Sequence, residues 1–158
     1  MNTVVRRAEL LDAPAIARVH LAAHLEAYSH VIDPALLEDF TLEMREGVWA
    51  KSLEHGGSDV WVAERDGEIV GFSSSGPPRD DPPARPLELW SLYLLQSEHG
   101  SGAGQLLLDV AVADRPTSLW VLGQNPRARR FYERNGFALD GAQKLDARWN
   151  VVDLRMVR

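Results

Sequence analysis

A glycine-rich turn at residues 99–104 is the segment whose residue types and spacing most directly suggest ligand binding. Gly100, Gly102 and Gly104 allow unusual backbone φ values and let the backbone approach a ligand closely. Apolar residues follow from Leu106 with the pattern of a helix, so the turn should lead into a helix N-terminus. The free N–H groups and positive dipole end of such a terminus attract anions. A diphosphate could therefore bind there through backbone groups, without a lysine.

Two common phosphate-binding motifs do not fit this turn. A P-loop needs Gly-Lys-Ser/Thr at the helix start, and the chain has Gly104-Gln105-Leu106 instead. A dinucleotide-binding fingerprint needs Gly-x-Gly-x-x-Gly, whereas the spacing here is Gly-x-Gly-x-Gly. Taken alone, the turn is therefore consistent with a phosphometabolite site or with a flexible loop that binds nothing.

Two further blocks give the turn a more specific meaning. Leu92-Tyr93-Leu94 followed by His99-Gly100-Ser101-Gly102-Ala103-Gly104 resembles the acetyl-CoA-binding motif of the GNAT acetyltransferases, in which Leu-Tyr-Val leads to Arg/Gln-x-x-Gly-x-Gly/Ala. His99 stands where that family usually has arginine or glutamine. Residues 125–137 are similar to the family's next block, Asn-x-x-Ala-x-x-Phe-Tyr and Gly-Phe. The chain thus resembles a GNAT N-acetyltransferase over most of its length.

The resemblance implies that acetyl-CoA is the acetyl donor and that a primary amine of a small molecule or peptide is the acceptor. A non-catalytic acyl-CoA-binding module of the same fold is the alternative. Asn125 either contacts the cofactor or caps the helix that begins at Pro126, and the two roles are compatible. Arg127, Arg129 and Arg130 either contact the 3′-phosphate of CoA or form a solvated face. The residues that the resemblance assigns to acetyl-CoA are Leu94 (through its backbone N–H), His99, Gly100, Ser101, Gly102, Ala103, Gly104 and Asn125.

Two side chains are candidates for the proton transfers of this reaction. Tyr132 matches the family's general acid, and its phenol, with a reference pKa of about 10, is protonated at neutral pH and can protonate the departing sulfur. Its alternative role is core packing beside Phe131. Glu88 is the candidate base and acceptor contact, because the resemblance implies a glutamate base at this position and burial beside Trp90 would raise its pKa; the alternative is a glutamate on an exposed strand face. Tyr28 either lines the acceptor pocket or packs between two helices.

The predicted elements place these residues on a single α/β domain, residues 1–158. Asp33-Pro34 should open a second helix that runs to Leu53, and Asp66-Gly67 should form a hairpin turn between two strands. The five prolines of residues 76–86 predict a loop. The resulting order is β-α-α-β-β-β-α-β-α-β-β. It matches the GNAT fold, with a mixed, mostly antiparallel sheet of six to seven strands flanked by about four helices.

The composition limits the remaining function classes. The chain has 158 residues and no cysteine, which excludes disulfides, thiolate zinc sites and a cysteine nucleophile, so acetyl transfer should be direct. Its net charge of −6 argues against a nucleic-acid partner. No segment has the character of a signal peptide or a membrane span, so we expect a cytoplasmic protein without membrane association or a bound metal. The family resemblance alone implies a homodimer.

Overall fold

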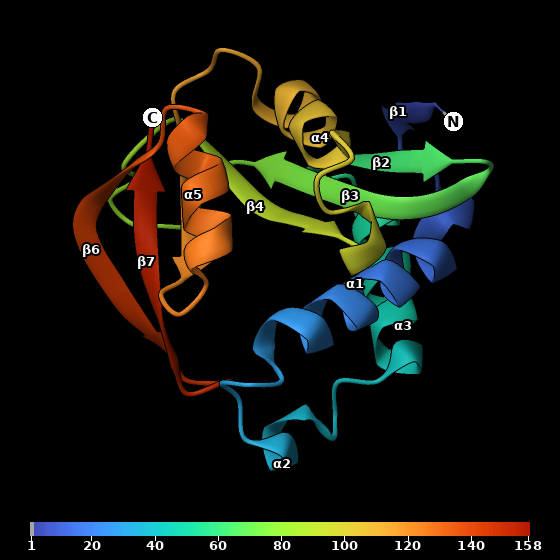
Figure 1. The fold of residues 1–158 in the computed structure, drawn as a ribbon, viewed down its shortest axis with the longest axis horizontal. Helices are drawn as coiled ribbons and strands as arrows, with labels where there is room; N and C mark the ends of the chain where they lie inside the picture. Colours follow the sequence, from blue (N-terminus) through green and yellow to red (C-terminus); the bar gives the residue numbers. More distant parts are fainter. Residues whose placement is uncertain (1) are drawn as a thin grey trace.

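The computed structural model describes residues 2–158, whose strands form one seven-stranded sheet (Figure 1). The strands are β1 (Thr3–Arg7), β2 (Asp59–Arg65), β3 (Glu68–Gly76), β4 (Leu87–Leu94), β5 (Thr117–Leu122), β6 (Ala138–Asp146) and β7 (Val151–Val157). Their order across the sheet is β1-β2-β3-β4-β5-β7-β6, and every neighbouring pair is antiparallel except β4 and β5. The predicted α/β architecture with a mixed, mostly antiparallel sheet is confirmed.

Five α-helices accompany the sheet: α1 (Ala13–Tyr28), α2 (Pro34–Leu37), α3 (Leu42–His55), α4 (Ala103–Val112) and α5 (Pro126–Arg134). The prediction of one helix from Asp33 to Leu53 is wrong, because two separate caps divide this stretch. The Asp33 side chain accepts a hydrogen bond from Ala35 N at 3.0 Å, and the Thr41 hydroxyl accepts one from Met44 N at 3.2 Å. Three helices therefore lie between β1 and β2. Among residues 2–158, none of the helices has the length and apolarity needed to cross a membrane.

The helices form a layer on each face of the sheet. On one face α4 and α5 pack together, and Leu108 and Tyr132 meet in one buried cluster with strand residues. On the other face α1 and α3 cover a second cluster, in which Ile16 and Trp49 contact Phe72 of β3. The central strands β4 and β5 are thus enclosed between the two layers, away from the sheet edges.

The two central strands pair over only three residues each. Leu87–Leu89 of β4 lie beside Thr117–Leu119 of β5. On the other side of β4, Ser74 pairs with Ser91 but Ser75 pairs with Leu89, so Trp90 is an extra residue at a β-bulge. Beyond this point β4 and β5 separate, which opens the sheet in the middle.

Candidate active site

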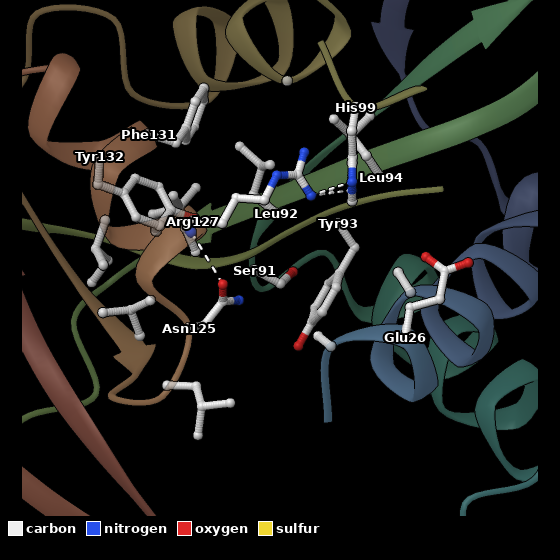
Figure 2. Close-up of a pocket in the computed structure, with 18 of the residues that line it drawn as sticks. Glu26, Ser91, Leu92, Tyr93, Leu94, His99, Asn125, Arg127, Phe131 and Tyr132 are labelled. Atoms are coloured by element: carbon white, nitrogen blue, oxygen red, sulfur yellow. Dashed lines mark hydrogen bonds between the residues drawn. The ribbon is translucent and has the colours of Figure 1, made fainter. Parts of the chain in front are cut away.

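A cavity of about 590 Å³ lies where β4 and β5 separate (Figure 2). The end of α1, the β4–α4 turn, the first turn of α4 and one side of α5 complete its wall. Most of the residues predicted from the sequence meet here: Tyr28, Leu94, His99, Gly100, Gly102, Gly104, Asn125 and Tyr132 all line the cavity. Three predicted residues do not line it, namely Ser101, Ala103 and Glu88. The structure therefore brings together the predicted cofactor turn and the predicted acid, but not the predicted base.

The β4–α4 turn has the geometry that its glycines suggest. Gly100 and Gly102 have φ values of 83° and 91°, which L side chains rarely adopt. Gly104 has a different role, because a Cβ there would lie 3.0 Å from Cδ1 of Leu94, so glycine leaves room for this close approach. Ser101 and Ala103 support the turn from behind, since the Ser101 hydroxyl accepts a hydrogen bond from the N–H of the fully buried Ala103. The turn leads into the N-terminus of the ten-residue helix α4, and the first N–H groups of a helix are donors of the kind that bind anions.

The edge of β4 that faces the opening carries unpaired backbone donors. Leu95 N donates to Val70 O of β3 at 3.0 Å. Successive N–H groups of a strand point to opposite edges, so Tyr93 also donates toward β3, while Leu92 and Leu94 point the other way, where β5 has moved aside. The N–H of Leu92 is therefore a second donor on the same edge as the predicted donor Leu94. Sequence reasoning missed Leu92, although the same alternation along a predicted strand could have indicated it.

Tyr132 combines the two roles between which the sequence left a choice. The residue is only 8% exposed and packs against Phe131 and Phe137, with ring centroids 5.3 and 5.7 Å away. It also lines the cavity. Burial raises the pKa of its phenol above the usual value, so the group keeps its proton at neutral pH.

Asn125 likewise has a structural role at the cavity wall. Its Oδ1 accepts a hydrogen bond from Ala128 N at 3.1 Å and so caps α5. The same side chain faces the cavity (Figure 2).

Tyr28 also combines packing with a place at the cavity. It lines the cavity while its ring stacks on His24, with centroids 4.2 Å apart and an interplanar angle of 4°.

His99 is in contact with an arginine that the sequence left undecided. Arg127 Nη1 reaches from α5 to both ring nitrogens of His99, with 3.1 Å to Nε2 (Figure 2). Burial and this neighbouring cation lower the pKa of His99. Arg127 lines the cavity, whereas Arg129 and Arg130 do not. A histidine and an arginine from two different elements therefore flank the predicted diphosphate cradle.

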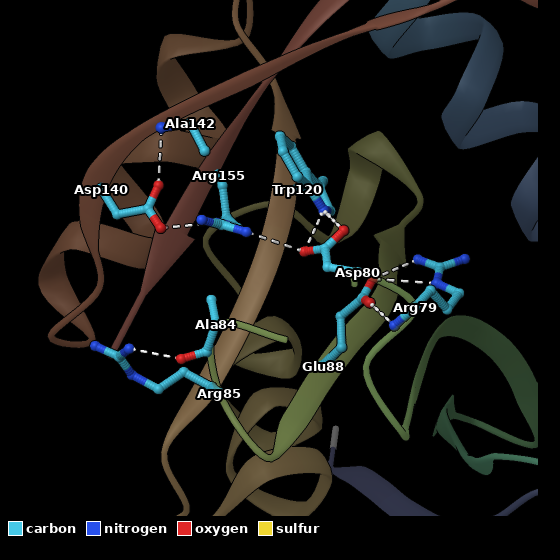
Figure 3. A network of polar contacts seen from close by, with 9 residues as sticks. All are labelled: Arg79, Asp80, Ala84, Arg85, Glu88, Trp120, Asp140, Ala142 and Arg155. Atoms are coloured by element: carbon cyan, nitrogen blue, oxygen red, sulfur yellow. Dashed lines mark hydrogen bonds and ion pairs between the residues drawn. The ribbon is translucent and has the colours of Figure 1, made fainter. Parts of the chain in front are cut away.

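Glu88 lies away from this cavity in an ion pair. Its side chain is 1% exposed, Arg79 N donates to Oε1 at 2.8 Å, and Arg79 Nη2 lies 2.6 Å from Oε2 (Figure 3). The glutamate is therefore neither on an exposed strand face nor free to take a proton in the cavity. The interaction could not be read from the sequence, because it depends on how the 76–86 loop folds back over β4.

Comparison with known proteins gives the class of protein that this fold and site define. A GNAT acetyltransferase domain matches residues 56–139. The chain belongs to the GNAT acetyltransferase family and is an acetyl-CoA-dependent N-acetyltransferase. It is 30% identical over 146 residues to a protein of Mycobacterium tuberculosis named "probable N-acetyltransferase", covering 89% of this chain and 82% of that one. An uncharacterized N-acetyltransferase of Bacillus subtilis is 32% identical, covering 77% and 73% of the two chains.

Solved structures share the fold at lower identity. The PaiA N-acetyltransferase of Thermoplasma acidophilum, in complex with coenzyme A, has a TM-score of 0.72 at 18% identity, covering 98% of both chains. A ribosomal-protein-alanine N-acetyltransferase of Brucella melitensis has a TM-score of 0.73 at 24% identity, also covering 98% of both. These two structures support the fold assignment over nearly the whole length of the chain.

Proposed function

We propose that this acetyltransferase moves an acetyl group from acetyl-CoA directly to a primary amine of a small molecule or peptide. The observation that carries the proposal is that a protonated tyrosine, an anion-binding turn and free strand donors face one cavity. Relatives named as N-acetyltransferases support an amine as acceptor. Acetyl-CoA supplies the activated thioester in this reaction.

The β4–α4 turn would hold the diphosphate of acetyl-CoA. The positive φ values of Gly100 and Gly102 turn the backbone toward the ligand, and the N–H groups at the start of α4 provide fixed donors. His99 and Arg127 lie beside this cradle and add side-chain donors. Asn125 lines the same cavity at the start of α5.

The exposed edge of β4 would bind the thioester. The N–H groups of Leu94 and Leu92 donate to its carbonyl oxygen, and such fixed donors stabilise the negative charge that develops there. Tyr132 gives its phenolic proton to the departing sulfur. Since the chain has no cysteine to carry an acyl group, the amine attacks the donor directly.

The acceptor would approach from the α1 side, where Tyr28 lines the cavity. Glu88 is not part of this proposal, because Arg79 occupies both of its carboxylate oxygens outside the cavity. Proton removal from the amine therefore requires another group.

The direct test is CoA release from acetyl-CoA over a panel of alkylamines, polyamines, amino acids and peptides. We expect release that depends on the enzyme and on one class of amine, with the acetylated amine identified by mass spectrometry. Release with no acceptor above the rate of spontaneous hydrolysis would contradict the proposal.

A further inference from the structure

A carboxylate that the proposed site does not use lies beside the acceptor end of the cavity, just outside its lining. Asp153 of β7 pairs with Leu122 of β5, and residues directly opposite each other on neighbouring strands share a face of the sheet. Leu122 lines the cavity and packs in a cluster with Ile32 and Trp149 on the α1 side of the sheet. Asp153 therefore lies, half-buried, on the same face, one strand away from the opening.

Asp153 differs from the other acidic groups around the cavity in that, within the part of the chain that the structure describes, neither an ion pair nor a hydrogen bond holds its carboxylate, although Lys144 of β6 lies opposite it in the sheet. Among residues 2–158 its carboxylate has no ion pair and accepts no hydrogen bond. The neighbouring carboxylates all have partners: Glu26 accepts from Gln96 N, Asp80 from Trp120 and Arg155, Glu88 from Arg79, Asp140 from Arg155, and Asp146 from Arg148 N and Trp149 N. Figure 3 shows how Asp80, Glu88 and Asp140 are occupied by arginines. An ammonium group could therefore pair with Asp153 without breaking an existing contact.

The groups that face Asp153 come from three elements. Burial raises the pKa of Tyr28 on α1 and of Tyr93 on β4, and the charge of Asp153 raises both further. From β6, Asp146 adds to the effect of burial in raising the pKa of Asp153, and Lys144 opposes it more weakly. Leu122, the cross-strand neighbour of Asp153, lines the cavity together with Tyr28 and Tyr93, so Asp153 lies next to the surface that an acceptor would touch.

We propose that Asp153 binds the ammonium form of the acceptor and takes up its proton, with Tyr28 and Tyr93 accepting the other N–H bonds. The inference rests on the proposed function and adds a substrate class, primary alkylamines that arrive protonated. A carboxylate in a half-buried site pairs favourably with such a cation, and the pairing holds the nitrogen at the open edge of β4.

The proton balance of the reaction is complete with the residues present. The ammonium gives one proton to Asp153, and the freed lone pair forms the bond to the acetyl carbon. The carbon–sulfur bond breaks as Tyr132 gives its proton to the sulfur. The nitrogen then loses a second proton, which restores the Tyr132 phenol, and Asp153 passes its own proton to water. The products are the acetylated amine, CoA and one released proton.

The test compares Asp153→Asn with Glu88→Gln, two changes that remove a carboxylate and keep its shape. Asp153→Asn should lower kcat/KM for the best alkylamine about 100-fold at pH 7, with KM for acetyl-CoA within about twofold of wild type. Its remaining rate should rise with pH, because more of the amine is then already neutral. Glu88→Gln should keep the wild-type pH profile between pH 6 and 9.5.

Each result decides the assignment. A wild-type pH profile in Asp153→Asn, or a loss confined to Glu88→Gln, would overturn it. If the wild type releases no CoA with any amine, the proposed function fails and Asp153 is tested by binding instead. Benzylamine is then titrated calorimetrically into the CoA complex of both proteins. Binding that disappears in Asp153→Asn keeps the ammonium site, whereas equal or absent binding overturns it.

Discussion

At the scale of single residues, the side chains around the cavity hold the fold and present chemistry at the same time. Tyr132 packs in the core of α4 and α5 while facing the cavity, and Asn125 caps α5 from the cavity wall. Gly104 allows α4 to approach Leu94 closely. Because these residues also pack or cap the fold, their side chains are already held in position before a ligand binds.

The positive φ of Gly102 gives a prediction about stability. Gly102→Ala should lower the free energy of unfolding by about 1–2 kcal/mol, because a φ of 91° is costly for any residue with a Cβ. Gly47→Ala in α3 is the matched control. An added Cβ meets no atom within 4 Å at either position, but Gly47 has no positive φ, so alanine there should raise the free energy by about 0.5–1 kcal/mol. Urea titration measures both, and equal effects would show that the conformation at position 102 does not require glycine.

His99 gives a prediction about pH. Its pKa is lowered in the free protein, and a bound diphosphate would favour the protonated ring and raise that pKa. CoA affinity should therefore increase as pH falls through the bound-state pKa, and level off below the free-state pKa. Calorimetry from pH 5.5 to 8 measures this. His99→Gln, which cannot titrate, should show a flat profile, and a flat profile in the wild type would contradict the expectation.

At the scale of elements, the features that were predicted correctly are those that short sequence motifs determine. The Asp66-Gly67 turn joins β2 and β3 as expected, with φ values of 53° and 81°. The strand–turn–helix of the cofactor cradle was likewise predicted from its glycines. The break between α2 and α3 was missed, although Thr41 supplied its cap. The bulge at Trp90 and the pairing of Glu88 depend on contacts between distant strands and a loop, which no local pattern encodes.

The loop over β4 gives a prediction at this scale. Arg79→Ala removes the guanidinium that pairs with the buried Glu88 and leaves it only the backbone N–H at this position, which should cost about 2 kcal/mol of unfolding free energy. Asp81→Ala, an exposed change in the same loop, is the control and should cost less than about 0.5 kcal/mol. Thermal or urea denaturation distinguishes them. Equal stability of the two variants would mean that the ion pair does not hold the loop.

At the scale of the whole molecule, the sheet consists of two parts joined at its centre by three residue pairs of β4 and β5. The turn that we propose as the cofactor site follows β4 of one part, and α5 with Tyr132 packs over strands of the other. A ligand between them contacts both parts. The single domain and the homodimer expected from the sequence stay predictions, and light scattering measures the second.

Because a ligand would contact both parts of the sheet, its binding should raise the free energy of unfolding of the whole protein. CoA at about 100 times its dissociation constant should add about 2.7 kcal/mol to the free energy of unfolding and raise Tm accordingly. ATP is the control, since it carries phosphates but not the pantetheine arm that would lie along β4. Differential scanning calorimetry tests this prediction. An equal rise in Tm with ATP would favour a general nucleotide site in the turn.

The central claim is that Tyr132 acts as the acid in amine acetylation within this cavity, and Tyr132→Phe tests it most directly. The change removes one hydroxyl and keeps the ring that packs on Phe137. We predict that kcat for CoA release falls about 100-fold or more, while the dissociation constant for CoA stays within about twofold of wild type. An unchanged kcat, or equal losses in turnover and CoA binding, would contradict the assignment.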